Sequence, residues 1–158
     1  MPLSPTIVGM HYRYPDFYEV GREKVREYAA AVKNDDPAYH DEAAAAELGH
    51  DSLPAPLTFI SIFGYQAQTA FFANADIGIT DAQIVQVDQE LKFLKPIKAG
   101  DRLHCDVYLH AYRVAHGTDV IVTKNIISND RGEAVQESYT TLAGRSDESG
   151  EGFSNGTA

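Results

Sequence analysis

The chain has 158 residues, of which 44% are hydrophobic and 23% charged, and its formal net charge is −10. A chain of this size forms one domain with its own core, and this composition excludes a disordered, collagenous or transmembrane protein. The acidic balance disfavours nucleic-acid binding, because phosphate groups repel it. The single cysteine, Cys105, excludes an intrachain disulfide, and the N-terminal segment lacks a signal-peptide pattern, so we expect a cytoplasmic protein.

The first part of the chain is predicted to form an extended arm followed by two helices. Residues 1–19 hold three prolines and four aromatic residues, which favours an ordered, extended arm that packs its rings on the body. Apolar residues recur at helical spacing over 20–33. The Ala-rich segment 41–48 is predicted to be a short helix, with Asp41 as its N-cap and a glycine directly after it.

Residues 57–73 form the most apolar segment and contain no charged residue. Pro56 stands where the first position of a helix would be, which suits proline because the amide of that position has no partner within the helix. A helix that is apolar on every side is a buried helix. We therefore expect 57–73 to be a central helix buried on all sides.

The second half of the chain changes to a period of two, which indicates strands. Strands are predicted over 83–95, 102–113, 118–128 and 133–144, and the tail 146–158 is expected to be flexible. Helices followed by strands in hairpins indicate an α+β domain with an antiparallel sheet.

The domain is expected to span residues 1–145, with the sheet wrapped around the charge-free helix 57–73, which is the hot-dog architecture. That helix is the only predicted element suited to the buried face of the sheet. The sheet edges of such a unit stay unpaired unless they are covered. We therefore expect pairing into a dimer or pseudo-dimer.

Three stretches, 32–40, 53–59 and 95–101, are recognisable together in order and spacing. They resemble MaoC-like (R)-specific enoyl hydratases and dehydratases. Over nearly the whole chain the sequence resembles the A, substrate-holding subunits of mycobacterial (3R)-hydroxyacyl-ACP dehydratases. The resemblance implies a hydro-lyase subunit of type II fatty acid and mycolic acid elongation that uses no cofactor. It also implies a substrate bound to acyl carrier protein and a heterodimer with a homologous catalytic hot-dog subunit.

The catalytic motif of that family resembles Asp-x-Asn-Pro-x-His, whose Asp and His act as acid and base on one water or hydroxyl. Alignment on Pro37 places Asn34 at the Asp position and Tyr39 at the His position. An amide cannot act as a general base, and a phenol is a poor one at neutral pH. A second alignment keeps Asp35 and His40 at the family's spacing but displaces the proline, which shapes the turn, by one residue.

The family's second motif is Ala-His-Gly, in which the Gly N–H meets the thioester oxygen. Pro54, Ala55 and Pro56 stand there in this chain, and a proline at the Gly position has no N–H. Losing such a donor costs on the order of 2.7–4 kcal/mol of transition-state stabilisation. We therefore predict a non-catalytic subunit. The alternatives are a self-sufficient hydratase that uses Asp35 and His40, and an acyl-thioester-binding protein without catalysis.

The substrate-binding residues implied for this subunit are small or polar residues of helix 57–73, namely Ser61, Gly64, Tyr65 and Gln68. Ser61 and Tyr65 lie one turn apart on one helix face, where they could line an acyl channel. The alternative is that Ser61 is small for packing and that Tyr65 belongs to the core with its hydroxyl paired.

Other clusters of polar residues point less clearly to chemistry. His104, Asp106 and His110 share a strand face, which can suggest zinc, but the alternation explains them as a solvated face, so no metal is expected. A hot-dog thioesterase would carry an acid on the central helix, and 57–73 has none.

Lysines of the segment 92–98 offer a possible basic patch in an otherwise acidic chain. If Lys92, Lys95 and Lys98 gather at the strand end, they could contribute to docking of an acidic carrier protein. An ordinary solvated edge explains them equally well.

Overall fold

The computed structural model describes residues 5–75 and 84–145, and its centre is a six-stranded antiparallel sheet. The strands are β1 (His11–Arg13), β2 (Tyr18–Glu19), β3 (Ile84–Phe93), β4 (Arg102–Ala115), β5 (Thr118–Ser128) and β6 (Ala134–Arg145). They follow one another in the order β1-β4-β5-β6-β3, and β2 pairs with the start of β4. Each strand of the main path thus has its neighbour beside it in an antiparallel arrangement.

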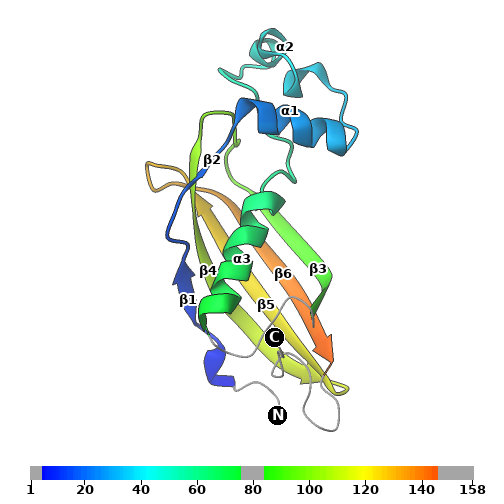
Figure 1. The fold of residues 1–158 in the computed structure, drawn as a ribbon, viewed down its shortest axis with the longest axis vertical. Coiled ribbons are helices and arrows are strands. Elements are labelled where there is room, and N and C mark those ends of the chain that lie inside the picture. Colours follow the sequence, from blue (N-terminus) through cyan, green and yellow to red (C-terminus); the bar gives the residue numbers. More distant parts are fainter. Residues whose placement is uncertain (1–4, 76–83, 146–158) are drawn as a thin grey trace.

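Two helices lie at one end of the molecule, and a third runs along one face of the sheet (Figure 1). The helices are α1 (Arg22–Ala31), α2 (Glu42–Glu47) and α3 (Ser61–Ala75), with short 3-10 turns η1 (Pro5–Ile7) and η2 (Pro37–Tyr39). The Asp41 carboxylate accepts a hydrogen bond from the amide of Ala44, so it caps α2 as predicted. Gly49 follows at φ +90°, a conformation that favours glycine and ends the helix.

The buried face of the sheet follows the alternation of the strands. Leu103, Cys105, Val107 and Leu109 are fully buried in β4, whereas the residues between them are more exposed. At the β5–β6 hairpin, Asn129 accepts hydrogen bonds from two amides of the turn through its side chain. The predicted strands are therefore present, each within two residues of the observed bounds over the described positions.

The N-terminal arm is extended and packs aromatic rings on the body, as predicted. Its two short strands pair with β4. The rings of Tyr14 and Tyr18 lie 5.5 and 5.3 Å from the ring of Phe63 on α3, measured between centroids. The arm therefore closes one side of the space between α3 and the sheet.

The central helix differs from its prediction in two ways. It begins at Ser61 rather than near Pro56, because the preceding residues form tight turns in which the Phe59 amide bonds the Pro56 carbonyl. It is also buried on one side only. Phe63 and Phe71 face the core, whereas Tyr65 is 61% exposed, so Tyr65 is not a core residue in this chain. The lack of charged residues in this helix therefore did not show which of its faces is buried in the core and which is exposed.

The outer edge of β3 ends the sheet, and among the described residues no strand pairs with it. Val85 and Val87 on this strand are 64% and 59% exposed. An exposed apolar edge is a template for pairing with another chain. If the chain associates through a sheet edge, as expected from the sequence, the outer edge of β3 is the candidate.

The α+β prediction, with an antiparallel sheet against a central helix, is confirmed. The predicted tail 146–158 lies outside the described residues. Within the described part of the chain, no helix is long and apolar enough to cross a membrane.

Candidate functional site

A cavity of about 350 Å³ lies between the segment 54–57 and the segment 93–97, and we call it the loop cavity. Most of its lining is apolar, including Leu48, Leu57 and Phe93. The cavity brings together residues of all three stretches that carry the family resemblance, 32–40, 53–59 and 95–101. It is therefore the place where the catalytic positions of the family can be compared with this chain.

The loop that carries the family's oxyanion donor is tied to the segment after β3. The Ala55 amide donates to the Ile97 carbonyl at 2.7 Å, and the Ala99 amide donates to the Leu53 carbonyl at 2.8 Å. Ala55 therefore has its amide engaged, and Pro56 has none to offer. Neither residue can present a backbone donor to a thioester oxygen in the loop cavity.

The alignment on Pro37 brings the residues at the family's Asn and His positions to the loop cavity, whereas Asn34, at the Asp position, is not among its lining residues. Tyr39 and Asp36 both line it. The Asp36 carboxylate caps η2 by accepting from the Ala38 amide at 3.0 Å, and the Asn34 side chain accepts from the Asp36 amide at 3.2 Å. These polar groups hold the turn, and the side chain at the family's His position is a tyrosine.

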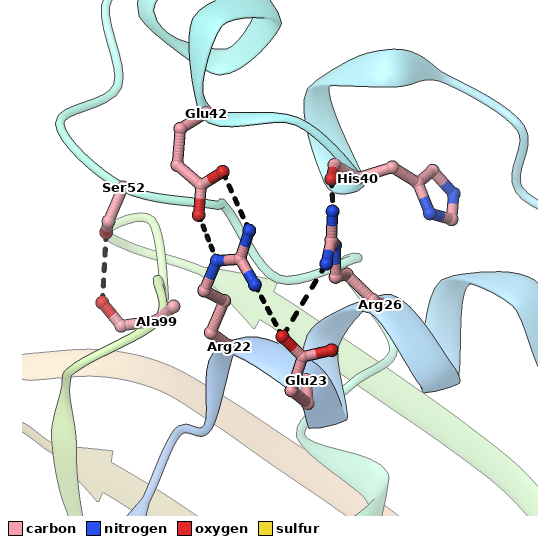
Figure 2. A network of polar contacts seen from close by, with 7 residues as sticks. All are labelled: Arg22, Glu23, Arg26, His40, Glu42, Ser52 and Ala99. Atoms are coloured by element: carbon pink, nitrogen blue, oxygen red, sulfur yellow. Dashed lines mark hydrogen bonds and ion pairs between the residues drawn. The ribbon is translucent and has the colours of Figure 1, made fainter.

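The alternative pair does not face the loop cavity. The His40 Nε2 lies 2.8 Å from the Asn34 carbonyl, and a carbonyl only accepts, so this nitrogen carries the proton. Arg26 donates to the His40 carbonyl at 2.8 Å, and Figure 2 shows the imidazole turned away from that contact. Asp35 is exposed. Neither Asp35 nor His40 lines the loop cavity.

An ion-pair network fixes the helices that frame this turn (Figure 2). Arg22 of α1 bonds both carboxylate oxygens of Glu42 at the start of α2, and it also contacts Glu23. Hydrogen bonding to Arg22 lowers the pKa of Glu42 to about 2. The network joins α1 to α2 and so positions the 37–40 turn.

A second cavity of about 380 Å³ lies between α3 and the sheet, and we call it the helix cavity. Ser61, Gly64, Tyr65 and Gln68, the four residues predicted to bind substrate, all line it. The fold therefore brings these four residues together at one cavity, and their role in substrate binding stays a prediction. The exposed face of α3 borders this cavity.

The sheet side of the helix cavity was not foreseen from the sequence. Asn125 of β5 and Ser138 and Thr140 of β6 face inward there. In β6 both faces carry polar residues, so the alternation did not tell which face is buried. The available signal was the Asn within the β-branched run of β5.

The two cavities follow one another along the β3–β6 pair. Phe93 and Gln136, paired across the strands, line the loop cavity, and the next inward-facing pair, Leu91 and Ser138, lines the helix cavity. Each cavity contains one buried polar residue with an unpartnered atom. These atoms are the Gln136 Nε2 and the Asn125 Oδ1.

His104 and Asp106, which the sequence analysis explained as part of a solvated strand face, have separate partners. Asp106 bonds His11 at 2.7 Å and Arg13 at 2.6 Å, and His104 pairs with Asp130 at 3.0 Å. The described part of the chain holds no group of three potential ligands placed for a metal ion. Burial raises the pKa of the Cys105 thiol to about 12, which makes it a poor nucleophile.

The three lysines considered for carrier docking are each engaged locally. Lys95 pairs with Glu133, and Lys98 pairs with Asp51 at 2.6 Å. The Lys92 ammonium lies 5.1 Å from the ring centre of Tyr139. Two of the three charges are therefore already balanced by acids, which weakens the predicted patch.

Comparison with known proteins shows the family to which the chain belongs. Residues 6–138 match the model of the FAS1-like dehydratase domain region. The chain is 66% identical over 158 residues, all of both chains, to the UPF0336 protein Rv0635 of Mycobacterium tuberculosis. It is 65% identical over 159 residues, again covering both chains fully, to the UPF0336 protein ML1910 of Mycobacterium leprae.

Solved structures resemble the chain in the same way. A chain of the C-terminally truncated HadBC (3R)-hydroxyacyl-ACP dehydratase complex of M. tuberculosis is 50% identical, with a TM-score of 0.82 over 87% of this chain and 97% of that one. A MaoC-like dehydratase is 38% identical with the same TM-score, over 90% of this chain and 43% of that one. These likenesses confirm the hot-dog fold and the predicted family.

Proposed function

This chain belongs to the family of MaoC-like, FAS1-like dehydratases, and from that premise we propose that it is the non-catalytic subunit of a heterodimeric (3R)-hydroxyacyl-ACP dehydratase. A homologous hot-dog partner supplies the catalytic Asp and His. This chain accommodates the acyl chain of a substrate carried by acyl carrier protein in fatty acid elongation of the mycolic acid type. No cofactor takes part.

One observation carries the proposal. At the loop cavity, the positions that correspond to the family's His and to its Gly donor hold Tyr39 and Pro56. Removal of water from a 3-hydroxyacyl thioester needs a base for the C2 proton, an acid for the leaving hydroxyl, and a donor for the thioester oxygen. The loop cavity supplies none of the three from these positions.

The free edge of β3 supports the second half of the proposal. Because β3 ends the strand order of the described residues, a strand of a partner chain can pair with its outer backbone edge. The HadBC relative is itself a complex of hydroxyacyl-ACP dehydratase subunits. A partner that pairs here also borders the exposed face of α3, so an acyl chain bound in the partner's site can extend toward the helix cavity.

The test is to purify this chain together with a homologous hot-dog subunit that has an intact Asp-x-Asn-Pro-x-His motif. Hydration of a long trans-2-enoyl thioester is then measured for three complexes. They are the wild-type complex, the complex with His40→Ala in this chain, and the complex in which the partner's motif histidine is replaced by alanine.

We expect the first two complexes to turn over at similar rates and the third to lose turnover by at least two orders of magnitude, the usual contribution of an acid–base group. Loss of turnover in the His40→Ala complex would instead favour catalysis by Asp35 and His40. Failure of the two chains to associate would favour an acyl-binding protein without a dehydratase partner.

A further inference from the structure

Polar side chains predominate among the residues that line the helix cavity. Ile60 and Leu91 are its aliphatic members, and most other lining residues carry amides or hydroxyls. Two of these groups pair with other side chains. The Thr123 hydroxyl donates to the Gln68 Oε1 at 2.8 Å, and the Gln89 Nε2 donates to the Thr140 hydroxyl oxygen at 3.3 Å. A methylene chain alone would leave the polar lining without a counterpart.

Asn125 differs from these neighbours. The residue is only 4% exposed, and its Oδ1 is buried without a hydrogen-bond partner among the described residues. Its Nδ2 lies 3.4 Å from the Gly64 carbonyl oxygen, and that contact fixes the orientation of the amide. Exchanging the two ends of the amide would place two acceptors together, so the unpartnered atom is the oxygen.

Gly64 makes this arrangement possible. A Cβ at position 64 would lie 3.3 Å from the Asn125 Nδ2, closer than nine in ten such contacts. The helix therefore approaches β5 closely where the asparagine stands. Native proteins rarely bury an acceptor without a donor, so a donor from outside the chain is the expected partner of the Asn125 Oδ1.

We propose that the helix cavity binds a hydrogen-bond donor carried by a linear thioester ligand, an O–H or an amide N–H that the Asn125 Oδ1 accepts. The mostly apolar loop cavity, next along the β3–β6 pair, suits an unsubstituted methylene segment. The inference rests on the proposed function, because it specifies which substrates that function would take. The donor is either a hydroxyl on the acyl chain or an amide N–H of the pantetheine arm.

Calorimetric titration of the full chain tests the proposal with four probes. They are decanoate, 3-hydroxydecanoate, 10-hydroxydecanoate and pantetheine. Asn125→Leu removes the acceptor with little change of volume, and Gly64→Ala shifts the asparagine amide while keeping it. Asn74→Leu is the matched control, because Asn74 is an exposed asparagine of α3, the helix of Gly64, and lies outside the helix cavity.

If the donor is an acyl hydroxyl, one hydroxydecanoate binds the wild-type chain about tenfold more tightly than decanoate, the ratio for one buried hydrogen bond. Asn125→Leu abolishes that preference, Gly64→Ala reduces it, and Asn74→Leu preserves it. If the donor is a carrier-arm amide, the dissociation constant of pantetheine shows the same pattern instead.

The proposal is overturned if no probe distinguishes Asn125→Leu from the wild-type chain, because the cavity then holds only water. A preference that depends on Asn125 in a chain whose complex has no dehydratase activity would refute the proposed function and leave this site standing. An active complex whose chain lacks the preference would refute this inference alone.

Discussion

Two neighbouring inward-facing side chains of β5, Thr123 and Asn125, differ in their hydrogen bonding. The Thr123 hydroxyl is paired with Gln68, whereas the Asn125 Oδ1 is buried without a partner among the described residues. Removing one member of a buried pair leaves the other unsatisfied and costs about 1–3 kcal/mol. Removing the Asn125 side chain costs less, because it loses only the long contact of its Nδ2 with the Gly64 carbonyl oxygen at 3.4 Å.

We therefore expect Thr123→Val and Asn125→Leu to change the free energy of unfolding differently. We expect Thr123→Val to lower the free energy of unfolding by about 1–3 kcal/mol, because it leaves the Gln68 Oε1 unpaired. We expect Asn125→Leu to lower it by less than Thr123→Val does, because only the long Nδ2 contact with the Gly64 carbonyl oxygen is lost. Urea unfolding followed by circular dichroism measures both, and an equal loss in the two variants would show that Asn125 is satisfied in the folded chain.

At the residue scale, the sequence was informative where a motif has a fixed spacing. The motif spacing predicts Pro56 at the family's Gly position and Tyr39 at its His position, and both residues line the loop cavity. The four helix residues expected at a binding site also share one cavity. Asn125 and Ser138 were missed, because a strand with polar residues on both faces does not show which face is covered.

At the junction of α1 and α2, the carboxyl group of Glu42 has a shifted pKa. Hydrogen bonding to Arg22 lowers the pKa of Glu42 from 4.5 to about 2. The folded state therefore binds fewer protons than the unfolded state between these values. The stabilisation from this pair is complete above about pH 5 and is lost as the pH falls through about 2.

We expect Glu42→Gln to lower the urea midpoint at pH 7 and to bring it closer to the wild-type midpoint at pH 3. The pair is exposed, so the difference at pH 7 is small. Glu47→Gln is the control, because Glu47 is an exposed acid of the same helix. A difference between Glu42→Gln and the wild-type chain that does not change with pH would contradict the assigned role of the carboxylate.

The exposed edge of β3 can be tested as the surface that binds the hot-dog partner. We expect Val87→Lys to reduce association with the hot-dog partner at least tenfold, because a lysine on an edge strand opposes pairing with another chain. Val114→Lys on β4 is the control, because Val114 is equally apolar, 51% exposed and distant from that edge in the sheet order. Analytical ultracentrifugation of the mixed chains measures the effect, and equal affinities for both variants would place the interface elsewhere.

The elements themselves were largely predictable, with one informative exception. Strand periodicity and turn residues located the strands of the sheet, and capping residues located α2. The central helix was predicted to begin too early and to be buried on every side. An uncharged sequence fits both a core and a surface that meets a partner, and the sequence of one chain does not separate the two.

The molecule as a whole combines two neighbouring cavities with Tyr39 and Pro56 at the positions that align with the family's His and Gly. The loop cavity is lined mostly by apolar residues, and the helix cavity is lined mostly by residues that carry amides or hydroxyls. The sheet ends in an exposed strand beside them. This combination is what a subunit needs if it holds substrate for chemistry performed by its partner.

The most direct measurement is the rate at which the purified, folded chain alone hydrates a long trans-2-enoyl thioester, compared with its complex with an intact partner. We predict no turnover above the uncatalysed rate for the chain alone and clear turnover for the complex. Turnover by the chain alone that His40→Ala abolishes would contradict the account, because it would show that Asp35 and His40 form a working catalytic pair.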